Sequence, residues 1–277
     1  MDSPKIADSA RALREILRGW QGRRIALVPT MGALHEGHLS LVRAARAQSD
    51  KIIVSIFVNP AQFAPNEDFA AYPRDLPGDA QKLAGADLIF APGVEDMYPK
   101  GFATGMTVGG PAQGLESDFR PHFFGGVALV VAKLLIAAAP HVAIFGEKDY
   151  QQLLVVRSMV RDLGLPVEIV GVPTLREADG LAMSSRNAYL SADERKVAGK
   201  MNVVLANAVA RLRAGAAIAA VEAEASAALK EAGFDTVDYV AVRDAENLQA
   251  IQIIAAPARI LAAARVGRTR LIDNMPV

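Results

Sequence analysis

Apolar residues along the first two thirds of the chain follow two alternating patterns. Short, dense runs rich in β-branched residues favour strands, whereas runs with apolar residues every three or four positions favour helices. The strand-like runs are 25–30, 51–60, 87–91, 142–145 and 167–172. The helix-like runs between them are 39–45, 79–86, 126–139 and 150–163. The order of these runs predicts a repeated alternation of strands and helices.

The strand-like runs are apolar throughout, which is typical of a parallel sheet that helices cover on both faces. This order of elements predicts right-handed crossovers and an α/β fold with a doubly wound, Rossmann-like parallel sheet. Ligands of such sheets bind beyond the carboxyl ends of the strands. Polar clusters follow four of the predicted strands, at 30–38, 59–62, 146–152 and from 173 onward. We therefore expect these four loops to form one site.

The segments outside this alternation differ in character. A helical period of apolar residues over 6–20 predicts an N-terminal helix. The Gly- and Pro-rich segment 92–121 is too long for a simple connection, so we expect it to take part in binding. Ser191, with Glu194 three positions later, makes a capping box that predicts a helix extending to about Ala214. The elements expected after it are an Ala-rich helix and two strands, at 218–233, 236–244 and 258–266.

A polar connector at 178–191 precedes these last elements, which together indicate a small α+β unit. We therefore place a domain boundary near Pro173. The prediction is a Rossmann-like domain over 1–173 and a smaller C-terminal α+β domain over 174–277.

Composition excludes several classes of protein. Of 277 residues, 52% are hydrophobic and 22% are charged, values of a compact globular protein and not of a disordered one. Thirty basic and thirty acidic residues give no net charge, so we expect no nucleic-acid or membrane partner. The chain has no cysteine and its N-terminus shows no targeting pattern, which suits a cytoplasmic location. The apolar run 123–140 is short and interrupted by Lys133, so we expect a buried helix there.

The sequence HEGH at 35–38 lies between a predicted strand and a predicted helix. The free N–H groups of a helix N-terminus can hold an anion such as a phosphate. His35 and His38 are three residues apart, so they share one face of the helix and can contact one ligand. Gly37 has no Cβ and lets a flat ring or a ribose approach the backbone. A nucleotide site is one interpretation of this motif.

The residues themselves leave other interpretations open. The two histidines could be a structural pair or metal ligands, although their spacing differs from the zinc-protease pattern. The sequence has neither a phosphate-binding Gly-Lys-Ser/Thr loop nor a Gly-x-Gly-x-x-Gly motif after the first strand. Asp79 is a weak metal candidate and a better candidate for a helix N-cap. The arginines near the C-terminus fit a solvated face; these are Arg265, Arg268 and Arg270.

Four motifs together decide between these interpretations: PTMGALHEGH at 29–38, FVNPAQF at 57–63, FGEKDYQQL at 145–153 and EADGLAMSSRN at 177–187. The chain resembles the pantothenate synthetase family, the pantoate:beta-alanine ligases of the HxGH nucleotidyltransferase superfamily. The resemblance covers nearly the whole chain. It implies an enzyme that uses ATP to activate the carboxylate of pantoate as an acyl adenylate. The amine of beta-alanine then displaces AMP to give pantothenate.

The resemblance also implies site residues. Catalytic roles fall to His35, His38, Lys148 and Arg186, with His38 as the family's proton donor. The implied ATP contacts are Met31, Gly32, Ala33, Leu34, His35, Glu36, Gly37, His38, Gly146, Glu147, Lys148, Asp149, Leu175, Met183, Ser184, Ser185 and Arg186. The implied contacts to pantoate and beta-alanine are Asn59, Gln62, Arg120 and Gln152. Met31 and Phe63 would line an apolar wall for the dimethyl group of pantoate.

This chain departs from the family pattern at two places. The family commonly reads Arg-Pro-Gly-His-Phe, whereas here Arg120 is followed by Pro121-His122-Phe123, so a substrate contact by His122 is in doubt. Leu175 stands where the family usually has valine. The resemblance further implies Mg²⁺ bound with the nucleotide, at residues that the sequence does not identify, and a homodimer.

Because acyl adenylates hydrolyse readily, we also expect the C-terminal domain to act as a lid that excludes water. Two other functions share such a site. One is transfer of an adenylyl group to a phosphate-bearing acceptor, and the other is nucleotide binding without catalysis.

Overall fold

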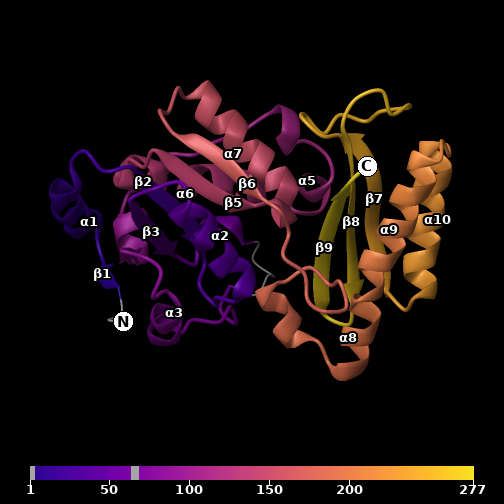
Figure 1. Ribbon diagram of the computed structural model, residues 1–277, viewed down its shortest axis with the longest axis horizontal. Coiled ribbons are helices and arrows are strands. Elements are labelled where there is room, and N and C mark those ends of the chain that lie inside the picture. Colours follow the sequence, from indigo (N-terminus) through magenta and orange to yellow (C-terminus); the bar gives the residue numbers. More distant parts are fainter. Residues whose placement is uncertain (1–3, 64–68) are drawn as a thin grey trace.

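The computed structural model describes residues 4–63 and 69–277, and Figure 1 shows them as two lobes, each built on its own sheet. Within these residues the larger sheet has six strands in the order β1-β4-β3-β2-β5-β6, all parallel. Their bounds are Lys5–Ala7 (β1), Ile25–Thr30 (β2), Lys51–Ile56 (β3), Leu88–Phe90 (β4), Val142–Gly146 (β5) and Glu168–Val172 (β6). The prediction of a doubly wound parallel sheet is confirmed.

Helices cover both faces of this sheet. Alternate residues of the central strands point to opposite faces, so Leu27 and Ile53 pack with one set of helices and Val28 and Ile52 with the other. The first set is α1 (Ala10–Leu17), α6 (Phe123–Ala138) and α7 (Tyr150–Asp162). The second set is α2 (Glu36–Arg46) and α3 (Leu76–Lys82). Burial on both faces explains why the strands are apolar throughout.

The strand order reverses between β2 and β5. From β2 the chain proceeds outward to β3 and β4 on one side, and it later returns to add β5 and β6 on the other. The loops that leave β2 and β5 therefore diverge and leave a crevice at this point. The HEGH motif follows β2 and the GEKD sequence at 146–149 follows β5, so the topology places both motifs at the crevice.

Two local predictions in this lobe are wrong. Ile6 belongs to the short edge strand β1, so the first helix begins only at Ala10, with Ser9 as its N-cap. Helix α3 begins at Leu76 because the Asp75 side chain caps it, so Asp79 lies inside the helix. The segment 92–121, which we expect to take part in binding, contains the short helices α4 (Val94–Met97) and α5 (Glu116–Phe119).

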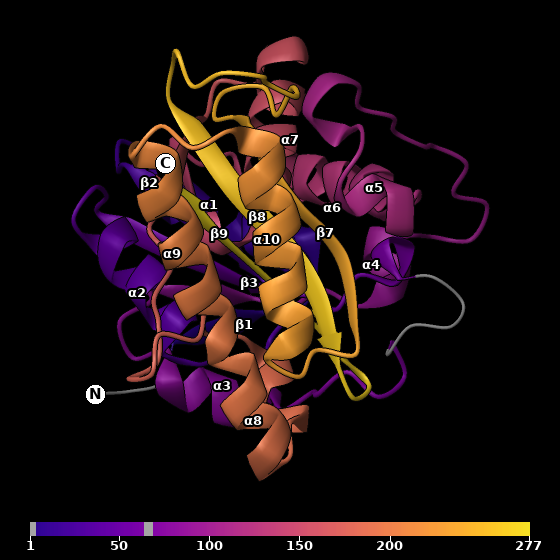
Figure 2. The same cartoon turned by 90° about the vertical axis from the view of Figure 1, so that its right-hand side faces the viewer.

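The smaller lobe is an antiparallel sheet of three strands among the described residues, in the order β7-β8-β9. The strands are Thr236–Asp244 (β7), Ala258–Val266 (β8) and Thr269–Pro276 (β9). In Figure 2, α9 (Lys200–Arg213) and α10 (Ile218–Glu231) lie side by side over one face of this sheet. The predicted strands at 236–244 and 258–266 are confirmed, and β9 was missed.

The capping box of Ser191 and Glu194 is present and opens α8 (Ala192–Ala198). The helix predicted to extend to Ala214 is interrupted at Gly199, which separates α8 from α9. A Cβ at this position would lie 2.7 Å from a carboxylate oxygen of Asp179, so glycine lets the polar connector pass close to the helix. The break therefore accommodates a long-range contact.

The two lobes pack against each other through one apolar core. Ala241 on β7 and Leu261 on β8 are buried with residues of α6 and α7, so the small sheet turns its other face to the large lobe. The boundary near Pro173 agrees with the change from one sheet to the other, but division into two independent domains stays a prediction. Across the described part of the chain, no helix is both long and apolar enough to cross a membrane.

Candidate active site

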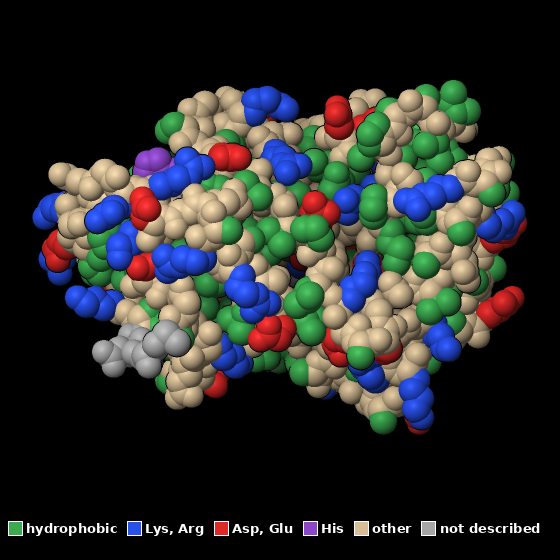
Figure 3. Space-filling model, viewed as in Figure 1, with side chains coloured by type: hydrophobic (Ala, Val, Ile, Leu, Met, Phe, Trp, Pro, Cys, Tyr) green, Lys and Arg blue, Asp and Glu red, His purple; other side chains and the backbone are tan. Residues whose placement is uncertain are grey.

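A cavity of about 540 Å³ lies between the two lobes. Its walls come from the ends of β2 and β5, from residues between 173 and 186, and from β8 and β9. In Figure 3, basic and acidic side chains are interspersed on the face shown, which agrees with the absence of net charge in the sequence. The cavity lies where the sheet topology predicts a ligand site.

Most of the predicted site residues line this cavity. They are Met31, His35, Gly37, His38, Asn59, Gln62, Phe63, Arg120, Gly146, Lys148, Asp149, Gln152, Leu175, Met183, Ser184, Ser185 and Arg186. The predicted residues that lie outside its lining are Gly32, Ala33, Leu34, Glu36 and Glu147. His122 is exposed and also lies outside the lining. This position argues against a contact between His122 and a substrate, in agreement with its shift from the family pattern.

The two histidines begin α2. His35 is the N-cap, and its Nδ1 accepts a hydrogen bond from the Gly37 N–H at 3.1 Å. The Nδ1 of His38 accepts from the His35 N–H at 3.3 Å, and the ring centroids are 4.1 Å apart. A neutral imidazole carries one proton, so with Nδ1 as acceptor the proton is assigned to Nε2 in both rings. Each histidine therefore has one N–H donor left for a ligand.

Both histidines are held in the neutral form. Burial, followed by the positive charge of Lys148, lowers the pKa of His35 to about 4. Burial, followed by His35 and Lys148, lowers the pKa of His38 to about 3. At neutral pH these rings are uncharged hydrogen-bond donors. His38 would be a poor source of a full proton, since a general acid needs a pKa near the working pH.

Gly37 is required by His35 itself. A Cβ on Gly37 would lie 2.8 Å from Cε1 of the His35 ring and 3.4 Å from the Met183 side chain. The flat ring expected to approach this glycine is therefore the neighbouring imidazole. A side chain at position 37 would push the His35 ring out of its capping position.

The loop before the histidines is held by α3. Gly32 and Ala33 have positive φ angles of 83° and 51°, which is unusual for alanine. The buried Asp79 carboxylate accepts from the N–H groups of Ala33 and Leu34, both at 2.8 Å. Asp79 is therefore not an N-cap, and both of its carboxylate oxygens accept hydrogen bonds within the protein. It compensates the strain of this loop, a role that the sequence pattern did not indicate.

Gln62 is oriented by its neighbours. Its Nε2 donates to Sδ of Met31 at 2.8 Å, and its Oε1 accepts from Asn59 at 3.2 Å. Asn59 is fully buried, and its amide also bonds to Gly126, Ala61 and the Tyr98 hydroxyl. All hydrogen-bonding positions of the Asn59 side chain are therefore used within the protein. Its predicted contact with substrate would break one of these bonds, so the geometry favours support of Gln62.

Arg120 also supports Gln62. Its Nη2 donates to the backbone carbonyl of Gln62 at 3.1 Å, and its guanidinium stacks on Phe123 at 3.8 Å. The Arg120 guanidinium also pairs with the Glu116 carboxylate at 4.0 Å. Arg120 thus ties the long segment 92–121 to the loop after β3.

A buried charge cluster, consisting of Glu116, Asp238, Tyr239 and Arg270, was missed. The Glu116 carboxylate accepts from Arg270 at 2.8 Å and from the Tyr239 hydroxyl at 2.9 Å, and Asp238 accepts from Arg270 at 2.6 Å. Burial and the Glu116 carboxylate raise the pKa of the Tyr239 phenol, which keeps it protonated as a donor. The prediction that Arg270 belongs to a solvated face is wrong, because its side chain is 14% exposed.

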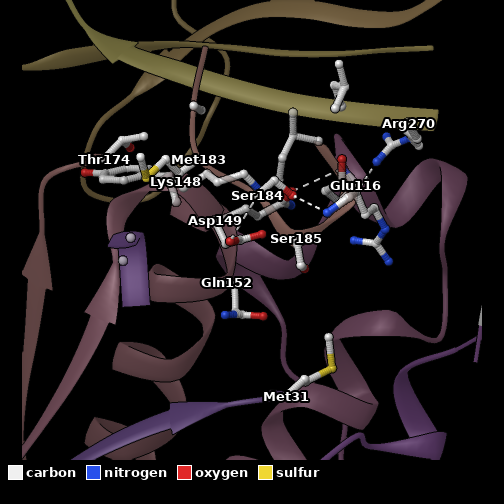
Figure 4. A pocket seen from close by; sticks show the side chains of 18 of the residues that line it. Met31, Glu116, Lys148, Asp149, Gln152, Thr174, Met183, Ser184, Ser185 and Arg270 are labelled. Carbon is white, nitrogen blue, oxygen red and sulfur yellow. Dashed lines mark hydrogen bonds and ion pairs between the residues drawn. The ribbon is translucent and has the colours of Figure 1, made fainter. Parts of the chain in front are cut away.

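Lys148 and Arg186, the two predicted cationic site residues, also line the cavity. Figure 4 shows Lys148 beside Met183 and Thr174, with Glu116 and Arg270 on the opposite side of the view. Nζ of Lys148 lies 3.9 Å from Asp149, and its charge acts on both histidines. Arg186 lies in the turn Ser185–Tyr189, where its N–H donates to the Ser184 hydroxyl at 3.3 Å. The structure therefore gathers imidazoles, a lysine and an arginine around one cavity.

Comparison with known proteins agrees with this arrangement. The family model for pantoate-beta-alanine ligase matches residues 5–276. Pantothenate synthetase from Mesorhizobium japonicum is 56% identical over 281 residues, covering 100% of this chain and 99% of the relative. The corresponding protein from Caulobacter vibrioides is 55% identical, with 100% of both chains covered.

Solved structures extend the similarity to the fold. Pantothenate synthetase from Thermus thermophilus superimposes with a TM-score of 0.93 at 47% identity, covering 98% of each chain. The ligase from Francisella tularensis, solved in complex with beta-gamma ATP and beta-alanine, gives 0.83 at 34% identity over 99% of this chain and 97% of that one. The chain therefore belongs to the pantoate-beta-alanine ligase family, the enzymes that join pantoate to beta-alanine.

Proposed function

We propose that this enzyme forms pantothenate in two half-reactions that share the cavity between the lobes. In the first, a carboxylate oxygen of pantoate attacks the α-phosphorus of ATP, the bond to the bridging oxygen breaks, and pyrophosphate leaves. In the second, the amine of beta-alanine attacks the acyl carbon, loses a proton as the amide bond forms, and AMP leaves. The proposal is supported above all by two neutral imidazoles and two cationic side chains on one cavity at the sheet's switch point.

The residues around the phosphates stabilise charge in the transition state. Negative charge develops on the phosphate oxygens as pyrophosphate departs, and fixed donors stabilise that charge best. The Nε2–H groups of His35 and His38 supply neutral donors, since both Nδ1 atoms are occupied. Lys148 and Arg186 supply positive charge. We assign His38 to hydrogen-bond donation and not to full proton transfer, because its pKa lies far below neutral pH.

The pantoate site is the amide-lined part of the cavity. Gln62 and Gln152 both line it, and Figure 4 shows Gln152 between Asp149 and Met31 in that view. A side-chain amide can donate to a carboxylate or hydroxyl without adding a charge that would lower the nucleophilicity of the acid. Met31 and Phe63 supply apolar surface for the dimethyl group. Asn59 and Arg120 act by fixing Gln62.

The remaining predicted ATP contacts fall into two groups. The loop residues Gly32, Ala33 and Leu34 shape the approach to α2, and Leu175 and Met183 join by a backbone hydrogen bond of 3.0 Å at the cavity wall. Ser184 and Ser185 line the phosphate end together with Gly146, Lys148 and Asp149. Glu36 pairs with Arg43 and Glu147 with Arg259, so these two side chains support the site from outside.

Mg²⁺ would bind with the nucleotide and not in a site built by the protein. Within residues 4–63 and 69–277, no group of three His, Cys, Asp or Glu side chains is arranged to hold a metal ion. This agrees with the usual behaviour of Mg²⁺, which keeps several waters and binds through substrate phosphates with few carboxylates. The ion would add positive charge to the phosphates, and Asp149 is a carboxylate of the lining beside Lys148.

The cellular setting is also proposed. We place the enzyme in the cytoplasm as a homodimer that acts on small molecules and binds neither nucleic acid nor a membrane. Zero net charge supports the absence of nucleic-acid and membrane partners, and the lack of cysteine suits the cytoplasm. The homodimer rests on the family resemblance alone. We also propose that the connector carrying Met183 to Arg186 moves with the C-terminal domain, which closes over the acyl adenylate.

A product assay tests the reaction. With ATP, pantoate and beta-alanine together, we expect AMP, pyrophosphate and pantothenate in equal amounts. With pantoate alone, labelled pyrophosphate should exchange into ATP, because the first half-reaction is reversible. A stable adenylylated product from a phosphate-bearing acceptor would instead identify an adenylyltransferase, and absence of turnover with every acid would identify a binding module.

A further inference from the structure

We propose that Asn274, on β9 of the C-terminal lobe, is a positioning residue for Lys148. The inference rests on the function proposed above, in which Lys148 stabilises the reacting phosphates. Asn274 is separated from Lys148 by 126 positions in the sequence, yet its side chain bonds directly to the turn that carries the lysine.

The Asn274 amide holds two consecutive carbonyl groups. Its Nδ2 donates to the carbonyl of Glu147 at 2.9 Å and to the carbonyl of Lys148 at 2.8 Å. Asn274 is 3% exposed, so water does not compete for these bonds. With both carbonyls fixed, the direction in which the Lys148 side chain leaves the backbone is fixed too.

Arg259 fixes the amide in turn. Its Nη1 donates to Oδ1 of Asn274, and its Nη2 donates to the Glu147 carboxylate at 3.0 Å. The guanidinium stacks on Tyr150 at 3.8 Å. Since a guanidinium only donates and carbonyls only accept, the Asn274 amide has one possible orientation. Two strands of the small sheet thus hold both sides of one turn in the large lobe.

The Lys148 side chain needs this support. It is 20% exposed, and its ion pair with Asp149 spans 3.9 Å, which is longer than a hydrogen bond. The turn Glu147–Asp149 is a short 3-10 helix whose N-cap, Gly146, has no side chain to stabilise it. The positioning of the lysine therefore depends on its backbone, which Asn274 holds from the other lobe.

Asn274→Asp is the sharpest variant because it keeps the size of the side chain. The two N–H donors become a carboxylate oxygen that faces two carbonyl oxygens, so the turn must shift. A displacement of about 1 Å at a reacting group can cost on the order of a hundredfold in rate. We expect the pantoate-dependent exchange of pyrophosphate into ATP to slow about 30-fold in kcat, with little change in KM for pantoate.

A double-mutant cycle with Lys148→Met separates positioning from general damage. If Asn274 acts through Lys148, then Asn274→Asp combined with Lys148→Met should be within about threefold of Lys148→Met alone. The matched control is Met275→Ala, the next residue on β9, which packs against the C-terminal core. Any loss of exchange rate caused by Met275→Ala should be the same factor in the wild-type and in the Lys148→Met enzyme.

The outcomes are distinct. If Asn274→Asp slows Lys148→Met by a further 30-fold or so, the positioning role is overturned while the proposed function stands. If the wild-type enzyme shows no exchange with pantoate, the proposed function falls and this inference falls with it. If Asn274→Asp does not fold, Arg259→Met keeps the contact with Tyr150 and removes both donors. Arg259→Met should slow pyrophosphate exchange less than Asn274→Asp does, and this loss of rate should disappear when Lys148→Met is also present. A loss of rate that persists in that double variant counts against the positioning role of Asn274.

Discussion

The HEGH loop and the buried charge cluster border the same cavity but are assembled in opposite ways. In the loop, the contacts that orient His35 and His38 join residues two or three positions apart. In the charge cluster, Glu116 meets Tyr239 and Arg270 across 123 and 154 positions. The loop is therefore set by local backbone structure, whereas the cluster exists only when both lobes are folded together. We expect damage to the cluster to appear in stability and damage to the loop in catalysis.

The largest expected effect tests the cluster. Arg270→Met removes the cation that bonds to both Glu116 and Asp238, and it leaves Glu116 only with Arg120 at 4.0 Å. Breaking one partner of a buried ion pair costs about 3–5 kcal/mol. We expect a fall of that order in the free energy of unfolding in urea. Arg161→Met is the matched control, since its pair with Asp162 is exposed and should contribute less than about 1 kcal/mol. Equal losses in the two variants would show that the cluster does not join the lobes.

The next effect tests the loop. His38→Ala removes one transition-state donor, so we expect kcat to fall at least about a hundredfold while the free energy of unfolding changes much less than in Arg270→Met. His122→Ala should stay within about twofold of wild type, because that histidine is exposed and outside the cavity lining. Initial rates of pantothenate formation measure both. A near-normal rate for His38→Ala would remove this histidine from the mechanism.

The same contrast explains what the sequence could predict. Strand and helix periods are local, so the parallel sheet and a site in the loops that follow its strands could be predicted. The strand order and the switch point between β2 and β5 could not, because strand pairing is not local. The roles of His35, His38, Lys148 and Arg186 came from motif resemblance, and the structure places these residues on one cavity. Their contacts with substrates stay predictions.

The buried polar contacts could not be predicted, because the residue types suggest exposed positions and the partners that allow burial are remote in sequence. In β9, Asp273 and Asn274 are buried polar residues whose partners, Arg176 and the GEKD turn, are remote in sequence. A polar residue in a strand pattern indicates a solvent-facing position unless its partner is known. Asp79 was misjudged for the same reason, since its carboxylate bonds to a loop 45 positions earlier. Conversely, Ile6 fits a helical period by coincidence and lies in an edge strand.

The free energy of unfolding measured as a function of pH also distinguishes the two regions, because the HEGH loop contains two neutral histidines and the charge cluster contains none. The pKa of His35 is lowered to about 4 and that of His38 to about 3, so between pH 6.5 and pH 4 the unfolded chain binds protons that the folded chain does not. The stability that the two neutral histidines contribute is therefore fully present above about pH 6.5, and it falls as the pH decreases toward 4.

The histidine contribution can be isolated by subtraction. In the double variant His35→Asn/His38→Asn, the carboxylates still titrate but the two imidazoles are gone, and asparagine can still cap α2. We expect the free energy of unfolding of wild type to fall more steeply than that of the variant between pH 6.5 and 4.5. Parallel curves would show that the imidazoles take up protons in the folded state as easily as in the unfolded one.

The smallest effect tests a departure from the family pattern. The family resemblance implies a valine where this chain has Leu175, and this residue is 37% exposed at the cavity wall. One methylene in an apolar contact is worth about 0.8 kcal/mol when fully buried, and less at this exposure. Because Leu175 contacts Met183 through its backbone carbonyl, that bond persists in Leu175→Val. We therefore expect KM for ATP to change by less than about threefold with kcat unchanged. A larger change in kcat would place this side chain against the reacting groups, in contrast to the wall position that it has here.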